Sequence, residues 1–190
     1  MTHKKHIAVF ASGNGSNFEA IAGACAENRL NAEVALLVCD NPDAYVIKRA
    51  EKFNIPVFKF RPKDYATKAD YETEIVQLLK KNNVDLICLA GYMRLVSDVL
   101  LNEFEGKIIN IHPSLLPAFK GLNAIEQAFE YGVKITGVTT HFVDKTMDGG
   151  KIIEQVAVPI ENSSLEELKE RIHAVEHELY VRTINRLIME

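Results

Sequence analysis

Short apolar runs rich in β-branched residues alternate along the chain with stretches that carry apolar residues at helical spacing. The runs predict strands at residues 7–11, 33–39, 57–60, 85–90, 107–111, 137–143 and 152–158. The stretches between them predict helices at residues 16–28, 44–53, 68–82, 94–104, 122–131 and 165–188. This alternation is typical of an α/β fold, a Rossmann-like three-layer sandwich in which helices cover both faces of a mostly parallel sheet.

The last two predicted strands differ from the others because no helix separates them. Only residues 144–151 lie between them, and this polar segment contains Gly149 and Gly150. Such a short link cannot make a parallel crossover, so we expect an antiparallel step near the C-terminal end of the sheet. The sequence contains no repeat, low-complexity tract or linker, which predicts a single domain over residues 1–190.

Asn110 and His112 stand two residues apart at the end of the fifth predicted strand. Alternate strand residues share a face, so the amide and the imidazole should project the same way, and Pro113 should keep His112 extended. A carboxamide beside an imidazole can stabilise the oxyanion of an acyl-transfer reaction. The same pattern, taken alone, is also typical of a polar strand end that caps a turn.

Residues 13–17, Gly-Asn-Gly-Ser-Asn, follow the first strand and open the first helix. Glycines and free amides at a helix N-terminus favour a bound phosphate, although a simple capped turn would look similar. The spacing of Ser16 and Glu19 fits a capping box and places the helix start at Ser16. A dinucleotide site would need a third glycine where Phe18 stands, with Asp40 as its ribose-binding acid.

A carboxylate follows the sixth predicted strand at Asp148, before two glycines. Ligands of open α/β sheets bind beyond the carboxyl ends of the strands, so Asp148 should lie near His112 and favour its protonated form. Asp144 is the competing acid, and a plain turn aspartate is the structural alternative. His173 and His177 have the spacing of a metal pair, but Ala174 follows the first histidine and no third ligand is evident, so no metal site is expected.

The composition limits the class of protein. The chain has 190 residues, of which 47% are hydrophobic and 25% charged, and no apolar stretch approaches a membrane span. A net charge of -4 argues against broad nucleic-acid binding, and the N-terminal apolar run is too short for a signal peptide. Cys25, Cys39 and Cys88 are an odd number, which favours reduced cysteines and a cytoplasmic protein.

Four motifs together resemble the phosphoribosylglycinamide formyltransferases, a family of folate-dependent enzymes of purine biosynthesis. They are residues 12–17, 90–94 and 110–117, and residues 137–143 with the Asp-Gly-Gly at 148–150. The resemblance covers nearly the whole chain and implies transfer of a formyl group from 10-formyltetrahydrofolate to the amine of 5'-phosphoribosylglycinamide. It implies that the reaction needs no metal and that these small molecules are the binding partners, without nucleic acid or membrane. The protein is expected to be a monomer or a homodimer.

The resemblance also implies roles for individual residues. Asn110, His112 and Asp148 would be catalytic, while the substrate would be held by Gly15, Ser16, Asn17 and Glu176. The folate would contact Lys68, Met93, Arg94, Leu95, Val96, Asn110, Asp144 and Asp148.

The sequence is also compatible with other functions. Related formyltransferases and formyltetrahydrofolate deformylase normally carry a further domain, for which the sequence shows no counterpart. A nicotinamide-dependent oxidoreductase would depend on the glycine turn and Asp40. A non-catalytic folate or nucleotide sensor is disfavoured by the presence of Asn110, His112 and Asp148.

Overall fold

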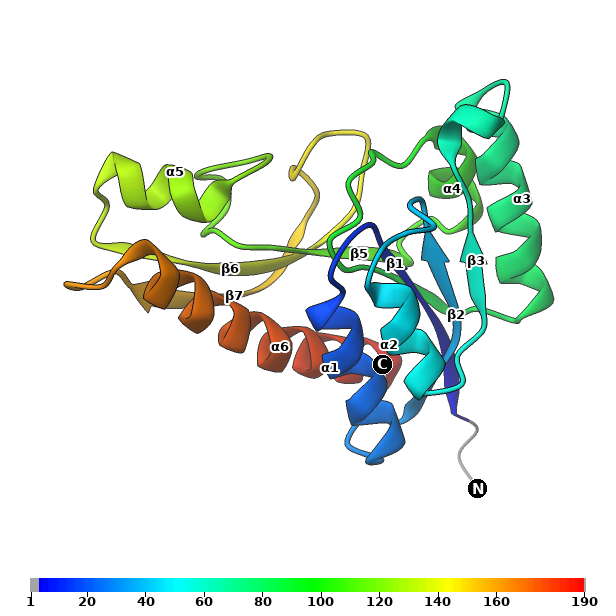
Figure 1. Cartoon of the computed structure of the whole chain (residues 1–190), viewed down its shortest axis with the longest axis horizontal. Coiled ribbons are helices and arrows are strands. Elements are labelled where there is room, and N and C mark those ends of the chain that lie inside the picture. The colour runs from blue at the N-terminus through cyan, green and yellow to red at the C-terminus, as the bar shows by residue number, and fades with distance from the viewer. Residues whose placement is uncertain (1–3, 190) are drawn as a thin grey trace.

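Seven strands form one mixed sheet in the order β3-β2-β1-β4-β5-β6-β7 (Figure 1). The structure is a computed structural model that describes residues 4–189. Every predicted strand is present, and the observed bounds are β1 Lys5–Ala11, β2 Ala32–Cys39, β3 Val57–Lys59, β4 Leu86–Leu89, β5 Ile108–His112, β6 Ile135–Phe142 and β7 Ile152–Pro159. The α/β prediction is therefore confirmed.

The strand directions confirm the predicted antiparallel step and add a second one. β1 to β5 pair in parallel, whereas β6 is antiparallel to both β5 and β7. The alternation of strand and helix implied a parallel crossover from β5 to β6, and this was wrong. The intervening helix α5, Ala124–Tyr131, contacts the start of the last helix, where Glu126 pairs with Lys169 at 3.1 Å.

The helices of the described residues follow the predictions closely, with two differences. Their bounds are α1 Ser16–Ala26, α2 Val46–Lys52, α3 Lys68–Lys81, α4 Asp98–Glu103, α5 Ala124–Tyr131 and α6 Leu165–Met189, with an unpredicted 3-10 turn η1 at Pro62–Asp64. The helix predicted from residue 94 begins only at Asp98. Ser97 is its N-cap and accepts the N–H of Val99 at 3.3 Å, so residues 94–97 stay irregular.

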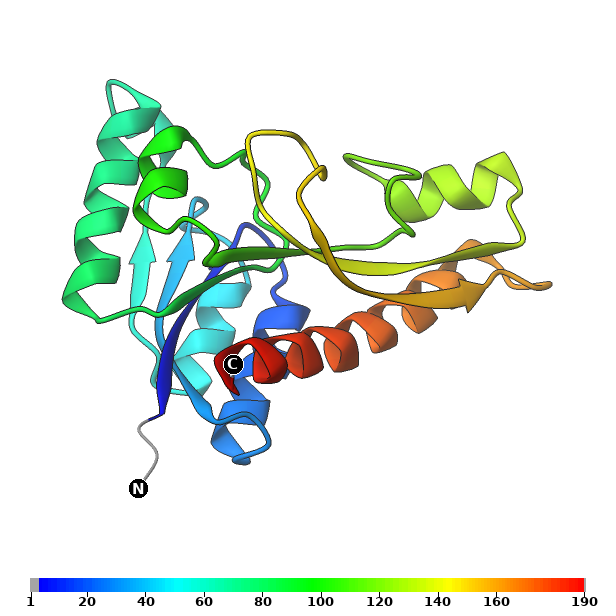
Figure 2. The same cartoon turned by 180° about the vertical axis from the view of Figure 1, so that it is seen from behind.

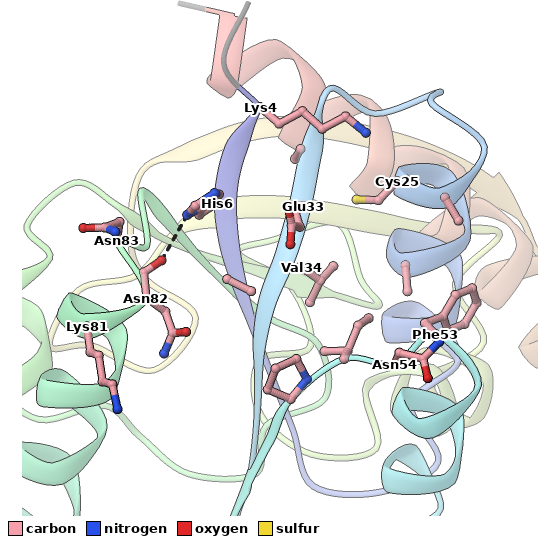
Figure 3. A pocket seen from close by; sticks show the side chains of 16 residues that line it. Lys4, His6, Cys25, Glu33, Val34, Phe53, Asn54, Lys81, Asn82 and Asn83 are labelled. Atoms are coloured by element: carbon pink, nitrogen blue, oxygen red, sulfur yellow. Dashed lines mark hydrogen bonds between the residues drawn. The ribbon is translucent and has the colours of Figure 1, made fainter.

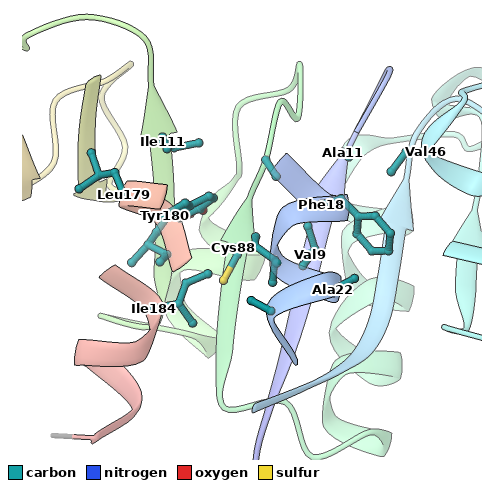
Figure 4. Packing of buried hydrophobic residues seen from close by; sticks show 14 of the residues in the cluster. Val9, Ala11, Phe18, Ala22, Val46, Cys88, Ile111, Leu179, Tyr180 and Ile184 are labelled. Atoms are coloured by element: carbon teal, nitrogen blue, oxygen red, sulfur yellow. The ribbon is translucent and has the colours of Figure 1, made fainter. Parts of the chain in front are cut away.

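Alternate residues of the strands serve two separate hydrophobic cores. Val9 of β1 packs with Phe18 of α1 and with α2 and α6, while Phe10 packs with Ile75 of α3 and with α4. Figure 4 shows the first core around Tyr180, whose hydroxyl donates to the carbonyls of Leu89 at 2.8 Å and Ile109 at 3.1 Å. The predicted placement of helices on both faces is thereby confirmed.

A groove of about 550 Å³ opens at the amino-terminal edge of the sheet (Figure 3). It is lined by Cys25 and Phe53 on one side and by His6 and Asn82 on the other, away from every predicted site residue. Burial raises the pKa of Cys25 to about 11, so this thiol is poorly reactive. All three cysteines are free, and no helix within residues 4–189 has the length and apolarity of a membrane span.

Candidate active site

Asn110 and His112 lie at the carboxyl end of β5, as predicted. Their neighbours Ile109 and Ile111 point into the core beneath α1 and α6, so the two polar side chains project from the opposite face. His112 is only 5% exposed, and the chain turns immediately after it, where Ser114 N–H donates to the His112 carbonyl. The strand therefore places the amide of Asn110 and the nearly buried imidazole of His112 at one edge of the sheet.

The orientation of the His112 ring follows from its two nitrogens. Nε2 lies 2.8 Å from the carbonyl oxygen of Phe119, which can only accept, so Nε2 carries a proton and donates. Nδ1 then faces Asp148, whose Oδ2 lies 3.6 Å away. The ring is held by the loop that follows β5 and directs its second nitrogen toward a carboxylate.

Asp148 reaches His112 by a different route from the one that the sequence suggested. Because β6 is antiparallel, its last residue Phe142 pairs with Ile109 and not with the exit of β5. The segment between β6 and β7 turns back instead (Figures 1 and 2). Within it, Asp148 Oδ2 accepts the N–H of Gly121 at 2.8 Å. A side chain at Gly150 would lie 1.8 Å from the Phe142 carbonyl oxygen, so this return requires a glycine.

The competing acid, Asp144, is engaged elsewhere. Its side chain is exposed and accepts the backbone N–H of Thr146 at 2.7 Å and the Thr146 hydroxyl at 2.6 Å. These hydrogen bonds to Thr146 lower the pKa of Asp144. The structure therefore brings Asp148, and not Asp144, to His112.

His141 is a candidate site residue that the sequence did not reveal, because the sequence alone does not fix which way its side chain points. It lies opposite Asn110 in the β5–β6 pairing, is 2% exposed, and places Nε2 at 3.2 Å from Asn110 Nδ2 and 3.9 Å from Asp148 Oδ1. Burial lowers the pKa of His141, so the neutral ring is favoured. The strand register is the signal that would have identified it.

The glycine turn at the start of α1 is shaped by α2. The helix begins at Ser16 as predicted, but its N-cap is Gly15 at φ 77°, without a side-chain cap. The predicted capping box is wrong because Glu19 pairs with Arg49, which also donates from Nε to the Asn14 carbonyl at 2.8 Å. Asn17 Oδ1 is buried and has no hydrogen-bond partner within residues 4–189, so it is available to a ligand.

Residues 93–96 lie beside this turn, in the connection between β4 and α4. Met93 N–H donates to Ser12 Oγ at 2.9 Å, and Ser12 N–H donates to the Gly91 carbonyl at 3.1 Å. Met93 is 64% exposed and Leu95 is 55% exposed, so both present apolar side chains to solvent. The two loops form one continuous edge with a polar turn and an apolar surface.

Arg94 points to Asp40, where its Nε donates to Oδ2 at 2.5 Å. Asp40 is the residue that a nicotinamide cofactor would need for its ribose, and the guanidinium already pairs with one of its two carboxylate oxygens. Phe18, which replaces the third glycine of that motif, is fully buried. Both observations disfavour the dinucleotide interpretation.

Lys68 lies next to residues 93–96, on the first turn of α3. Its Nζ donates to the Leu95 carbonyl and lies 3.8 Å from Glu72 Oε1. Glu72 is 2% exposed and accepts the N–H of Ser97 at 3.1 Å. These contacts attach the irregular segment before α4 to α3 and bring the predicted folate residue Lys68 to the same edge.

Glu176 lies on α6 and is 5% exposed. Its carboxylate accepts a hydrogen bond from His173 Nδ1 at 2.7 Å, and this bond raises the pKa of His173. His177 is partly buried, and burial lowers its pKa. Within the described residues, no three His, Cys, Asp or Glu side chains are grouped as metal ligands would be.

Comparisons with known proteins agree with this arrangement. Residues 5–184 match the family model described as formyl transferase. The chain is 55% identical to the phosphoribosylglycinamide formyltransferase of Bacillus subtilis (strain 168), over 97% of this chain and 95% of that protein. It is 42% identical to the trifunctional purine biosynthetic protein adenosine-3 of Chironomus tentans, over 92% of this chain and 13% of that protein.

A solved structure shows the same likeness in three dimensions. The crystal structure of glycinamide ribonucleotide transformylase 1 from Geobacillus kaustophilus matches with a TM-score of 0.94 and 56% identity, covering 97% of this chain and 99% of that chain. This chain therefore belongs to the formyl transferase family and, within it, to the phosphoribosylglycinamide formyltransferases.

Proposed function

We propose that this protein transfers the formyl group of 10-formyltetrahydrofolate to the primary amine of 5'-phosphoribosylglycinamide. The observation that carries the proposal is the group of Asn110, His112 and Asp148 at one strand exit, with Nδ1 of His112 3.6 Å from the Asp148 carboxylate. The likeness to phosphoribosylglycinamide formyltransferases over nearly the whole chain supports the same substrates.

The proposed reaction is a direct attack of the amine on the formyl carbon. Asn110 donates a hydrogen bond to the formyl oxygen, while protonated His112, held by Asp148, shares the charge that develops there. The amine must lose a proton and the folate nitrogen must gain one, and a water between Asp148 and His112 would relay it. No acyl-enzyme forms, because the amine itself is the nucleophile.

The two substrates would bind on either side of this group. Gly15, Ser16 and Asn17 would hold the phosphate with helix N-terminal amides, and the unpartnered Asn17 oxygen would accept from the substrate. Glu176 would contact the glycinamide end. The apolar side chains of Met93, Leu95 and Val96 would contact the pterin, with Arg94 beside them and the loop that holds Asp144 next to it. Lys68, whose Nζ donates to the Leu95 carbonyl, would bind the folate tail.

A single-turnover assay with 10-formyltetrahydrofolate and glycinamide ribonucleotide tests the reaction. Product formation is expected, whereas tight NAD binding without any response to folate would contradict the proposal. Asn110→Ala should lower kcat by roughly 10²–10³-fold with little change in either KM, since one oxyanion donor is lost. Asn162→Ala, at an exposed position before α6, is the matched control, and near-normal turnover of Asn110→Ala would overturn the assignment.

A further inference from the structure

The hydrogen bonds of His141 fix which of its nitrogens carries the proton. Nδ1 lies 2.8 Å from the carbonyl oxygen of Phe142, which can only accept, so Nδ1 carries the proton. The side chain is 2% exposed, and burial lowers the pKa of His141, so the ring is neutral. Nε2 of His141 therefore presents a lone pair and no proton.

This lone pair faces Asn110. Nε2 lies 3.2 Å from Asn110 Nδ2, so the amide must direct an N–H, and not its oxygen, toward His141. The opposite flip of the amide would set an oxygen lone pair against the imidazole lone pair. A chain of hydrogen bonds thus runs from Asn110 through His141 to the Phe142 carbonyl and leaves the second N–H of Asn110 free to donate.

We infer that His141 is a positioning residue that locks the carboxamide of Asn110 in the orientation that donates to the formyl oxygen. The inference depends on the role proposed for Asn110. A flipped amide would present its oxygen to the developing oxyanion and would repel it, so the lock matters most in the transition state. His141 acts through Asn110 and need not touch either substrate.

The charged groups around His141 are consistent with this role. Asp148 Oδ1 lies 3.9 Å from Nε2, and Asp148 and Asp144 favour protonation of His141, whereas His112 opposes it together with burial. Protonation would add an N–H at Nε2, which would then face the N–H of Asn110. The buried setting keeps the ring in the state that accepts from Asn110.

Two near-isosteric variants separate this role from a packing role. In His141→Gln the side-chain oxygen can take the place of Nε2 and accept the N–H of Asn110. In His141→Asn the shorter side chain can still donate to the Phe142 carbonyl, but it is too short to contact Asn110. We expect His141→Asn to lose kcat by roughly 10-fold, the effect of one lost hydrogen bond on a catalytic group, with both KM values unchanged. His141→Gln should retain most of the wild-type kcat.

A double-mutant cycle with Asn110→Ala assigns the cause. If His141 acts through Asn110, His141→Asn should cause no further loss of kcat in the Asn110→Ala protein. An equal loss in both backgrounds, or a wild-type kcat in His141→Asn, would overturn the inference. Near-normal turnover of Asn110→Ala would instead refute the role proposed for Asn110. Absence of turnover by the wild-type protein would refute the proposed function, so the failures are distinguishable.

A measurement on the unmodified protein covers the case in which a variant does not fold. The ¹⁵N chemical shifts of the His141 ring report its tautomer directly. We expect a protonated Nδ1 and a hydrogen-bonded, unprotonated Nε2 at neutral pH. A protonated Nε2 under the same conditions would contradict the inference.

Discussion

At the scale of single residues, the candidate site depends on which nitrogen of each buried histidine carries a proton. Nε2 of His112 donates to the Phe119 carbonyl, whereas Nδ1 of His141 donates to the Phe142 carbonyl. The two rings therefore turn different nitrogens toward Asp148. His112 presents Nδ1, which donates when the ring is protonated, whereas His141 presents Nε2, which is an acceptor. Backbone carbonyls set this division of roles.

After the amide of Asn110, the negative charge of Asp148 is the feature of the site that we expect to matter most for turnover. Asp148→Asn keeps an oxygen that can accept from Gly121 N–H but removes the charge beside His112, so kcat should fall by roughly 10²-fold or more. Steady-state kinetics with both substrates is the measurement. Asp64→Asn, at an exposed position in η1, should behave as wild type, and the same turnover in both variants would contradict the role of Asp148.

The residues found from the sequence and those missed differ in one physical respect. Asn110 and His112 are separated by a strand period, and Asp148 stands in a distinctive loop, so local rules identified them. The residues that were missed contact partners on other elements: His141 contacts Asn110, Arg49 contacts Asn14, and Glu72 contacts Ser97. Such pairs depend on strand register and helix packing, which a single sequence does not reveal.

At the scale of elements, the glycine turn is held from outside by α2. Val46 N–H donates to the Gly13 carbonyl at 3.1 Å, and the Val46 side chain fills the space beside Gly15, where a Cβ atom would come within 2.3 Å of Val46 Cγ2. The contact leaves no room for a side chain. The shape of the turn is therefore a joint property of β1, α1 and α2.

Replacing Gly15 tests this dependence. Gly15 has φ +77°, so Gly15→Ala would combine backbone strain with the Val46 clash and should cost about 1–3 kcal/mol of unfolding free energy, with a raised KM for the phosphorylated substrate. Gly13→Ala is the matched comparison for stability, because a Cβ there meets nothing within 4 Å. Thermal unfolding of both proteins checks the prediction, and equal Tm values would refute it.

The existence of elements was easier to predict than their ends. All seven strands were found because their apolar runs are short and bounded by polar turns. The capping box was assigned to Ser16, whereas the described residues form capping boxes between Thr67 and Asp70 before α3 and between Ser164 and Glu167 before α6. Motif spacing indicates where a cap is possible, but Arg49 of α2 competes for Glu19 and decides the outcome.

At the scale of the whole molecule, α6 connects the parts of the sheet on which the site depends. Tyr180 is fully buried and donates to the carbonyls of Leu89 in β4 and Ile109 in β5, directly beside Asn110. Thr183 of the same helix contacts Thr140 of β6 at 3.0 Å. One helix thus fixes β4, β5 and β6 relative to each other.

Removing the Tyr180 hydroxyl should weaken this connection without changing the ring packing. Tyr180→Phe removes the O–H that the Leu89 and Ile109 carbonyls share, so the unfolding free energy should fall by about 0.5–1.5 kcal/mol in urea denaturation. Tyr131→Phe, at a position 80% exposed, should leave stability unchanged. A Tyr180→Phe protein as stable as wild type would show that the hydroxyl contributes nothing to this connection.

The direction of β6 marks the limit of what the sequence could predict about the architecture. A helix between two strands usually belongs to a parallel crossover, but α5 packs beside α6 and the chain returns antiparallel to β5. This difference arises from packing between distant segments. The cytoplasmic location and the oligomeric state stay predictions.

The order of the candidate site residues along the chain has a consequence for synthesis and folding. Gly15 follows the first strand, whereas Asp148 and Glu176 stand in the last quarter of the chain. β1 is an interior strand between β2 and β4, while β6 and β7 form the last two strands on one side of the sheet. A growing chain can form the glycine turn early, yet it lacks Asp148 and α6 until synthesis is nearly complete. If the glycine turn holds the substrate phosphate as proposed, catalytic turnover reports complete folding more strictly than phosphate binding does.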